Sequence, residues 1–207
     1  MKKIMFDDRY KLTKAVLKGK KTVTRRIIPE DFFTLNWERR GDTLVYENAN
    51  GEFIDIRDSK YCKYKVGEKV AIAQRYKDIA IIQDEMFGTL YYLVGENRVT
   101  RDEIEAGWNN KLFVKSDWMP HCIKITNIRV ERLQDIDLED CLREGVGYAP
   151  TFFNLYPYFL DRKNKIMPIE YQYARDAFAY LIDHAGGKSK GTWDANPWVF
   201  VYEFEKC

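Results

Sequence analysis

The sequence predicts a mixed α+β fold, in which a small β-barrel carries peripheral helices and insertions. Three observations support this class: several short runs rich in β-branched residues, few helical patterns, and a strand-like segment at 197–204 that closes the chain. A chain of 207 residues can bury such a core. We expect a single domain over 1–207, with insertions at about 29–64, 74–117 and 147–192.

The N-terminal part predicts a helix followed by a strand. Residues 9–18 place apolar side chains near one helix face, Asp7 or Asp8 can cap the start, and Gly19 ends the pattern. Residues 22–28 are rich in β-branched side chains, which is typical of a strand.

The middle of the chain predicts further strands. Residues 43–57 indicate a hairpin around an Asn-Gly turn, and 70–73 form a compact apolar strand. Another strand is expected at 86–94. Residues 101–118 are polar and predict irregular structure.

The clearest strand is expected at 122–133, where the apolar positions change parity after Asn127 and so indicate a bulge or bend. A short helix is expected at 137–144, stopped by Gly145. A longer helix is expected at 169–184, followed by a loop.

Positive charge is concentrated near the N-terminus. Through residue 26 the chain carries ten Lys and Arg against two Asp, a net of +8, whereas the whole chain is only +2. Such a segment favours an anionic ligand, with nucleic acid or a nucleotide as the first expectation. A solvated helix followed by a basic turn would show the same pattern.

Cysteine and histidine usage predicts no metal site and no cofactor. The cysteines stand at 62, 122, 141 and 207 without paired spacing, and there are only two histidines. Scattered cysteines and an N-terminus that turns acidic at Asp7 favour a cytoplasmic location. No window approaches the roughly 18 apolar residues that a membrane span needs, so no membrane partner is expected.

Five segments in order resemble the ASCH domain of the PUA-like superfamily, most closely the longer form common in phages and prophages. They are GKKTVTRR at 19–26, YKVGEKV at 64–70, IKITNIRVERLQDI at 123–136, EDCLREGV at 139–146 and NPWVFVYEF at 196–204. The resemblance implies a PUA-like β-barrel with a cleft suited to RNA or a modified nucleoside. In place of the Arg-Glu-Thr-Trp-like run common in the phage-type proteins, this chain reads AQRY at 73–76.

One ASCH branch is similar to amidohydrolases that remove the acetyl group of N4-acetylcytidine. The resemblance implies catalytic roles for Lys21, Thr24 and Glu144. A threonine hydroxyl needs a base to become a nucleophile, and Lys21 can serve only if it is uncharged. Since residues 21 and 24 would lie on opposite faces of a regular strand, a turn near Thr22 is required. The alternative is that both threonines are ordinary strand residues and Lys21 is solvated.

Other residues are candidates for binding. Glu144 ends its helix, where the macrodipole disfavours a carboxylate, which suggests a partner such as Lys21 or a substrate amine. Arg25 and Arg26, with Lys20, are candidate phosphate ligands, although strand alternation brings only one arginine to a cleft. Trp118 is a candidate for stacking on a base.

Two function classes follow. The first, which we favour, is a binding domain that holds RNA, a nucleoside or a nucleotide through the basic segment. The second is an enzyme: an amidohydrolase of N4-acetylcytidine-type amides with a Thr nucleophile, a Lys base and a Glu acid, or an ASCH-type ribonuclease. The sequence leaves the oligomeric state open.

Overall fold

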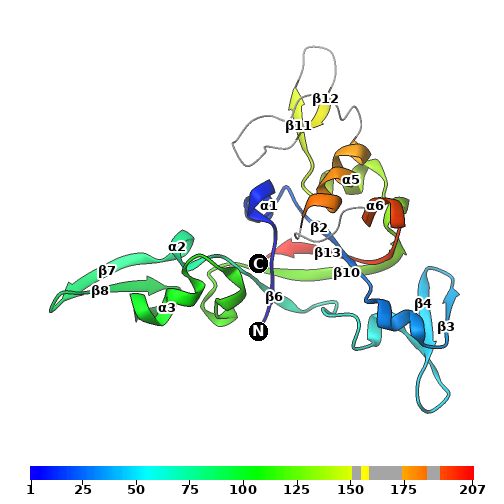
Figure 1. Ribbon diagram of the computed structural model, residues 1–207, viewed down its shortest axis with the longest axis horizontal. Coiled ribbons are helices and arrows are strands. Elements are labelled where there is room, and N and C mark those ends of the chain that lie inside the picture. The colour runs from blue at the N-terminus through cyan, green and yellow to red at the C-terminus, as the bar shows by residue number, and fades with distance from the viewer. Residues whose placement is uncertain (151–154, 159–173, 186–191) are drawn as a thin grey trace. The chain divides into compact units, whose positions relative to one another are not determined.

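The computed structural model describes residues 1–150, 155–158, 174–185 and 192–207 and has a mixed α+β fold with several sheets (Figure 1). The chain divides into two compact units, of which the first comprises Met1–Phe6, Lys69–Lys124 and Lys206–Cys207. The second comprises Asp7–Glu68 and Ile125–Glu205. Among the described strands no sheet closes into a barrel, so the mixed α+β class is confirmed and the predicted barrel is not.

The first unit contains two sets of paired strands and short helices. Strand β1 (Lys2–Ile4) runs parallel to β6 (Lys69–Ile72), which pairs antiparallel with the first residues of β10 (Cys122–Arg132). A meander follows β6 in sequence and consists of β7 (Ile81–Met86), β8 (Thr89–Val94) and β9 (Asn97–Thr100). The helical segments are α2 (Tyr76–Ile79), α3 (Arg101–Trp108), and the 3-10 turns η4 (Lys111–Phe113) and η5 (Ser116–Trp118).

The helix α3 corrects the expectation of irregular structure over 101–118. It begins with a capping box, in which Thr100 and Glu103 satisfy each other's backbone groups. Ile104 of this helix lies in the core of the unit, together with Ala71, Tyr76, Val94 and Val114. The capping signal therefore outweighed the polar composition of the segment.

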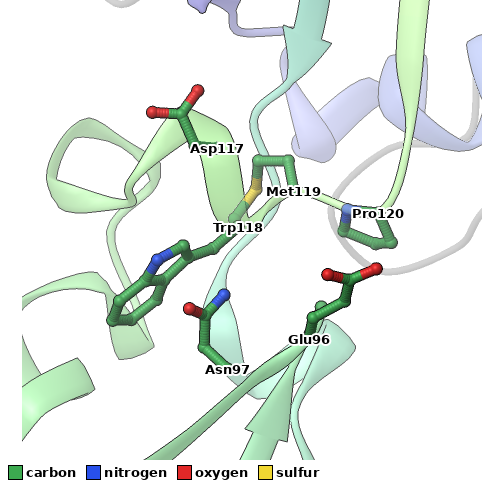
Figure 2. Close-up of a pocket in the computed structure, with 7 residues that line it drawn as sticks. Glu96, Asn97, Asp117, Trp118, Met119 and Pro120 are labelled. Carbon is green, nitrogen blue, oxygen red and sulfur yellow. The ribbon is translucent and has the colours of Figure 1, made fainter.

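Trp118 borders a pocket in the first unit (Figure 2). The turn between β8 and β9 lies close to the backbone of Trp118, since a Cβ on Gly95 would lie 2.9 Å from the Trp118 carbonyl oxygen. The pocket has a volume of about 530 Å³ and is lined by Gly95, Glu96, Asn97, Asp117, Trp118, Met119 and Pro120.

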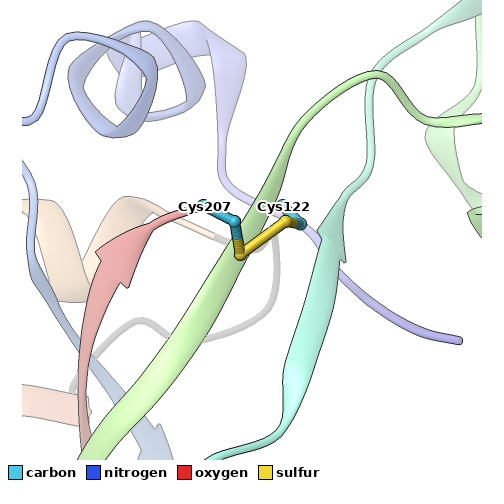
Figure 3. Close-up of a disulfide and its surroundings, with 2 residues drawn as sticks. All are labelled: Cys122 and Cys207. Carbon is cyan, nitrogen blue, oxygen red and sulfur yellow. A yellow bond between two sulfur atoms is a disulfide. The ribbon is translucent and has the colours of Figure 1, made fainter.

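A disulfide joins Cys122 at the start of β10 to Cys207 (Figure 3). The Cys207 backbone N–H also donates to the Cys122 carbonyl at 3.0 Å, which aligns the two segments. The spacing of the cysteines gave no sign of this pair and led us to expect a reducing environment. In the structure Cys122 and Cys207 are bonded, and Cys62 and Cys141 are free and buried.

The second unit starts with the 3-10 turn η1 (Asp8–Tyr10) and helix α1 (Leu12–Leu17), and continues with strand β2 (Val23–Ile27). Next come η2 (Glu30–Thr34) and a three-stranded sheet of β3 (Trp37–Arg40), β4 (Thr43–Glu47) and β5 (Phe53–Asp55), followed by η3 (Ile56–Asp58). The predicted hairpin over 43–57 is thus confirmed, and β3 adds a strand that was not expected.

The remainder of the second unit follows β10. Its elements are η6 (Leu133–Asp135), α4 (Leu138–Arg143), β11 (Gly147–Pro150), β12 (Leu155–Tyr158), α5 (Ala174–His184), α6 (Thr192–Ala195) and β13 (Trp198–Lys206). The predicted helix over 169–184 is confirmed from Ala174 onward, while 169–173 and most of the loop after it lie outside the described residues.

Strand β13 positions the candidate site. It lies between β10 and β2 in the sheet and pairs antiparallel with β2, with Tyr202 opposite Thr24. Its residues from Trp198 to Tyr202 are all buried. In β10, burial changes parity between Ile125 and Ile128, as the apolar pattern predicted. No helix in the described ranges is long and apolar enough to cross a membrane.

Candidate active site

The turn between α1 and β2 directs Lys21 inward. Gly19 adopts a left-handed conformation (φ +67°), and the backbone N–H groups of Lys20 and Lys21 both donate to the Ala15 carbonyl. The chain therefore turns sharply before β2 begins at Val23. Because Lys21 precedes the strand, the alternation of side chains along β2 does not determine its direction. Lys21 is 2% exposed, whereas Lys20 is exposed.

Lys21 forms a buried ion pair with Glu144. Its Nζ lies 2.5 Å from Glu144 Oε2 and donates to the Glu144 carbonyl at 2.7 Å. Glu144 is 3% exposed and caps the C-terminus of α4, where Gly145 reverses the chain with φ +92°. The helix macrodipole disfavours a carboxylate at the C-terminus of α4, and Lys21 supplies the positive charge that compensates Glu144 there.

Arg25 holds the other oxygen of Glu144. Its Nη1 lies 3.3 Å from Glu144 Oε1, and its Nη2 lies 2.8 Å from Asp140 Oδ2 and 2.6 Å from Glu131 Oε1. Phe178 of α5 covers the guanidinium, with 5.8 Å between its ring centroid and the Arg25 Cζ. Arg25 is 6% exposed and its donors are taken by carboxylates, an arrangement that differs from the phosphate ligand expected from the sequence.

Further ion pairs surround this centre. Arg129 of β10 contacts Asp140 and donates to Glu131 Oε2 at 2.9 Å. Arg143 of α4 donates to Asp140 Oδ1 at 2.9 Å and to Glu203 Oε2 at 2.7 Å. We call this set the charge network; it comprises the buried Lys21, Arg25, Asp140 and Glu144 and the partly exposed Arg129, Arg143, Glu131 and Glu203.

Burial shifts the pKa values within the network. Desolvation lowers the pKa of Lys21, and the opposing attraction of Glu144 does not fully restore it. For Asp140, burial would raise the pKa, but hydrogen bonds from Arg129 and Arg25 outweigh it and the pKa is lowered. Burial also raises the pKa of the Cys141 thiol to about 12, so this neighbour is an inert thiol.

Thr24 lies on β2 beside Arg25 and is 5% exposed. Within the described part of the chain, its side chain makes no hydrogen bond with Lys21 or Glu144. The structure therefore brings together Lys21 and Glu144, with Thr24 three residues further along the same segment.

The remaining predicted residues lie elsewhere. Lys20 and Arg26 are exposed at the surface of the second unit. Trp118 belongs to the first unit, where it lines the pocket of Figure 2. The Lys115 ammonium lies over its ring, 3.9 Å from the ring centroid.

Sequence reasoning did not single out Glu131, Asp140, Arg129, Arg143 or Glu203. Two signals were available. Arg129 and Glu131 are two residues apart on a strand and share a face, and Asp140 and Glu144 are four apart on a helix. Within the described residues, no group of His, Cys, Asp and Glu is arranged to hold a metal ion.

Comparisons with protein-family models, with curated proteins and with solved structures gave no match for this chain.

Proposed function

We propose that this chain is an ASCH-type amidohydrolase that cleaves the acyl amide of a modified nucleoside such as N4-acetylcytidine. The observation that carries the proposal is the enclosed Lys21–Glu144 pair, placed at the turn that leads directly into the strand bearing Thr24. A lysine enclosed in this way has a lowered pKa and is a better base than a solvated lysine.

The proposed chemistry assigns one role to each residue. A proton of the Lys21 ammonium first moves to Glu144, and the Thr24 hydroxyl then attacks the acetyl carbonyl carbon while its proton passes to the uncharged Lys21 amine. Lys21 returns that proton to the exocyclic nitrogen as the C–N bond breaks, which releases cytidine and leaves an acetyl ester on Thr24. Water then hydrolyses the ester to acetate. Glu144 stabilises the transient Lys21 ammonium and exchanges the proton with it.

The test is release of cytidine and acetate from N4-acetylcytidine by the purified protein. Lys21→Met should lower kcat by about 10²- to 10⁴-fold, the usual contribution of a general base. Thr24→Val should abolish turnover, and Thr24→Ser should retain part of it. Thr43→Val is the matched control, since Thr43 is a buried threonine of β4 outside the charge network. Lack of turnover by the wild-type protein would refute the proposal.

A second candidate function is binding of RNA or a nucleotide through the basic segment. It is favoured by the exposure of Lys14, Lys18, Lys20 and Arg26, which places several cations on the surface around the end of α1 and β2. Such contacts would orient an anionic substrate with or without catalysis.

Binding of this kind is tested by titrating a single-stranded RNA at several salt concentrations. Each phosphate contact contributes about 0.7 to the slope of log K against log salt concentration. Lys20→Glu should therefore weaken binding and reduce the slope, while Lys60→Glu, also exposed in the second unit, serves as the matched charge reversal. An affinity that does not change with salt would contradict this candidate function.

A further inference from the structure

Arg25 has an unusual environment for a residue of a basic segment. Its guanidinium is bound by carboxylates from β10 and α4, namely Glu131, Asp140 and Glu144. Its side chain is 1% exposed, and Phe178 lies against it. An arginine enclosed in this way is not accessible to an external anion, so its charge and hydrogen bonds act on the carboxylates around it.

The contacts divide the Glu144 carboxylate between two cations. Oε2 faces Lys21 at 2.5 Å, and Oε1 faces Arg25 Nη1 at 3.3 Å. The guanidinium is planar and its donors have fixed directions, so its position determines the orientation of the carboxylate that it binds. Asp140 and Glu131 in turn fix Arg25, and Arg129 binds both of these acids.

We propose that Arg25 is a positioning residue for the Lys21–Glu144 pair, with Asp140 as the acid that holds Arg25 in place. This inference rests on the proposed hydrolase function for its effect on rate. Arg25 keeps Glu144 Oε2 directed at Lys21 and places a second positive charge beside the ammonium, which favours the uncharged amine. Arg26 and Arg25 both act on Lys21 in this way, whereas Glu144 opposes them and favours the ammonium.

The first measurement does not depend on catalysis. The pKa of Lys21 is followed by NMR in protein labelled at lysine Cε, with the resonance assigned from the Lys21→Met spectrum. In Arg25→Met the pKa of Lys21 should rise, since a nearby like charge is removed. Arg25→Lys keeps a positive charge but lacks the planar set of donors with fixed directions, so its shift should be smaller. Arg26→Met removes another cation that lowers the pKa of Lys21, so it should also raise this pKa, and it shows the effect of a lost charge without loss of the contacts between Arg25 and the carboxylates.

The second measurement is the rate of hydrolysis of N4-acetylcytidine. Misplacing a catalytic pair lowers kcat by roughly ten- to a hundredfold. In Arg25→Met we expect this fall with KM unchanged, and partial recovery in Arg25→Lys. If circular dichroism shows that Arg25→Met is unfolded, the pKa of Lys21 and the rate of hydrolysis are measured in Asp140→Asn and Arg25→Lys in its place.

The outcomes separate the two proposals. An unchanged pKa of Lys21 in a folded Arg25→Met protein overturns the positioning role. A shifted pKa together with no turnover by the wild-type protein refutes the hydrolase while supporting the control of the pair by Arg25. A shifted pKa together with a lower kcat supports both.

Discussion

The ammonium group of Lys21 lies 2.5 Å from Oε2 of Glu144, and the two residues are only 2% and 3% exposed. Withdrawing two charges from water costs several kcal/mol per ion, so such a pair is stable only when its remaining hydrogen-bonding groups are satisfied. Here the Glu144 carbonyl and Arg25 provide those contacts. Either partner alone would be a buried, uncompensated charge.

Glu144→Gln should therefore lower the free energy of unfolding by about 3–5 kcal/mol. The double variant Lys21→Met/Glu144→Leu should be less destabilised than the sum of its single variants, because it leaves no unpaired charge. Urea denaturation measures both. Asp84→Asn, which breaks an exposed pair with Arg98 in the β7–β9 meander, should cost only about 0.2–1 kcal/mol. Equal losses from Glu144→Gln and Asp84→Asn would be inconsistent with a buried pair.

Acid should destabilise the protein through Asp140 and Glu203. For both, burial would raise the pKa, but hydrogen bonds from arginines outweigh it and the folded-state pKa lies below the ordinary values of 3.8 and 4.5. A lowered folded pKa contributes stability that is present above the unfolded pKa and is lost as pH falls through the folded value. The free energy of unfolding should thus decline below about pH 4, and less steeply in Asp140→Asn. Parallel declines in the two proteins would contradict this reasoning.

Gly145→Ala should be more destabilising than Gly41→Ala. Both glycines have left-handed backbones, with φ of +92° and +60°, where an alanine costs about 1–2 kcal/mol. A Cβ on Gly145 would also lie 3.4 Å from the Lys21 Cβ, whereas the space around Gly41 is open. Urea denaturation compares the two variants, and turnover should fall only in Gly145→Ala. Equal losses of stability would show that the contact with Lys21 is unimportant.

The disulfide should leave two thiols available in the denatured protein. Alkylation in denaturant without reductant should label Cys62 and Cys141 only, and mass spectrometry counts the labels. Since the bond closes a long loop, with a sequence separation of 85, its reduction should cost about 2–4 kcal/mol of stability. Cys207→Ser should match the reduced wild-type protein. Four labels in the non-reduced protein would contradict the bond.

Much of the second unit was predictable from the sequence. The helix ending before Gly19, the strand with Thr24, the helix ending at Glu144 and the closing strand all have local signals: glycine stops, an acidic cap and β-branched runs. These signals act over a few residues, so they could be recognised without knowledge of the tertiary structure.

The burial of Arg25 could not be predicted in the same way. Its carboxylate partners lie more than a hundred residues away, at Glu131 of β10, at Asp140 of α4 and at Glu144, which caps that helix, and only the tertiary fold brings them to Arg25. Charge counting identified Arg25 as a cation for an external ligand, because composition does not distinguish a compensated charge from a solvated one. The barrel expectation depended likewise on long-range strand pairing, which short patterns do not specify.

The distance along the chain between Lys21 and Glu144 also has a kinetic consequence. The two residues are 123 positions apart, so their contact closes a long loop and requires the surrounding strands to be assembled first. We expect the pair to form after the rate-limiting step of folding. Substitutions there would then mainly accelerate unfolding and leave the refolding rate nearly unchanged.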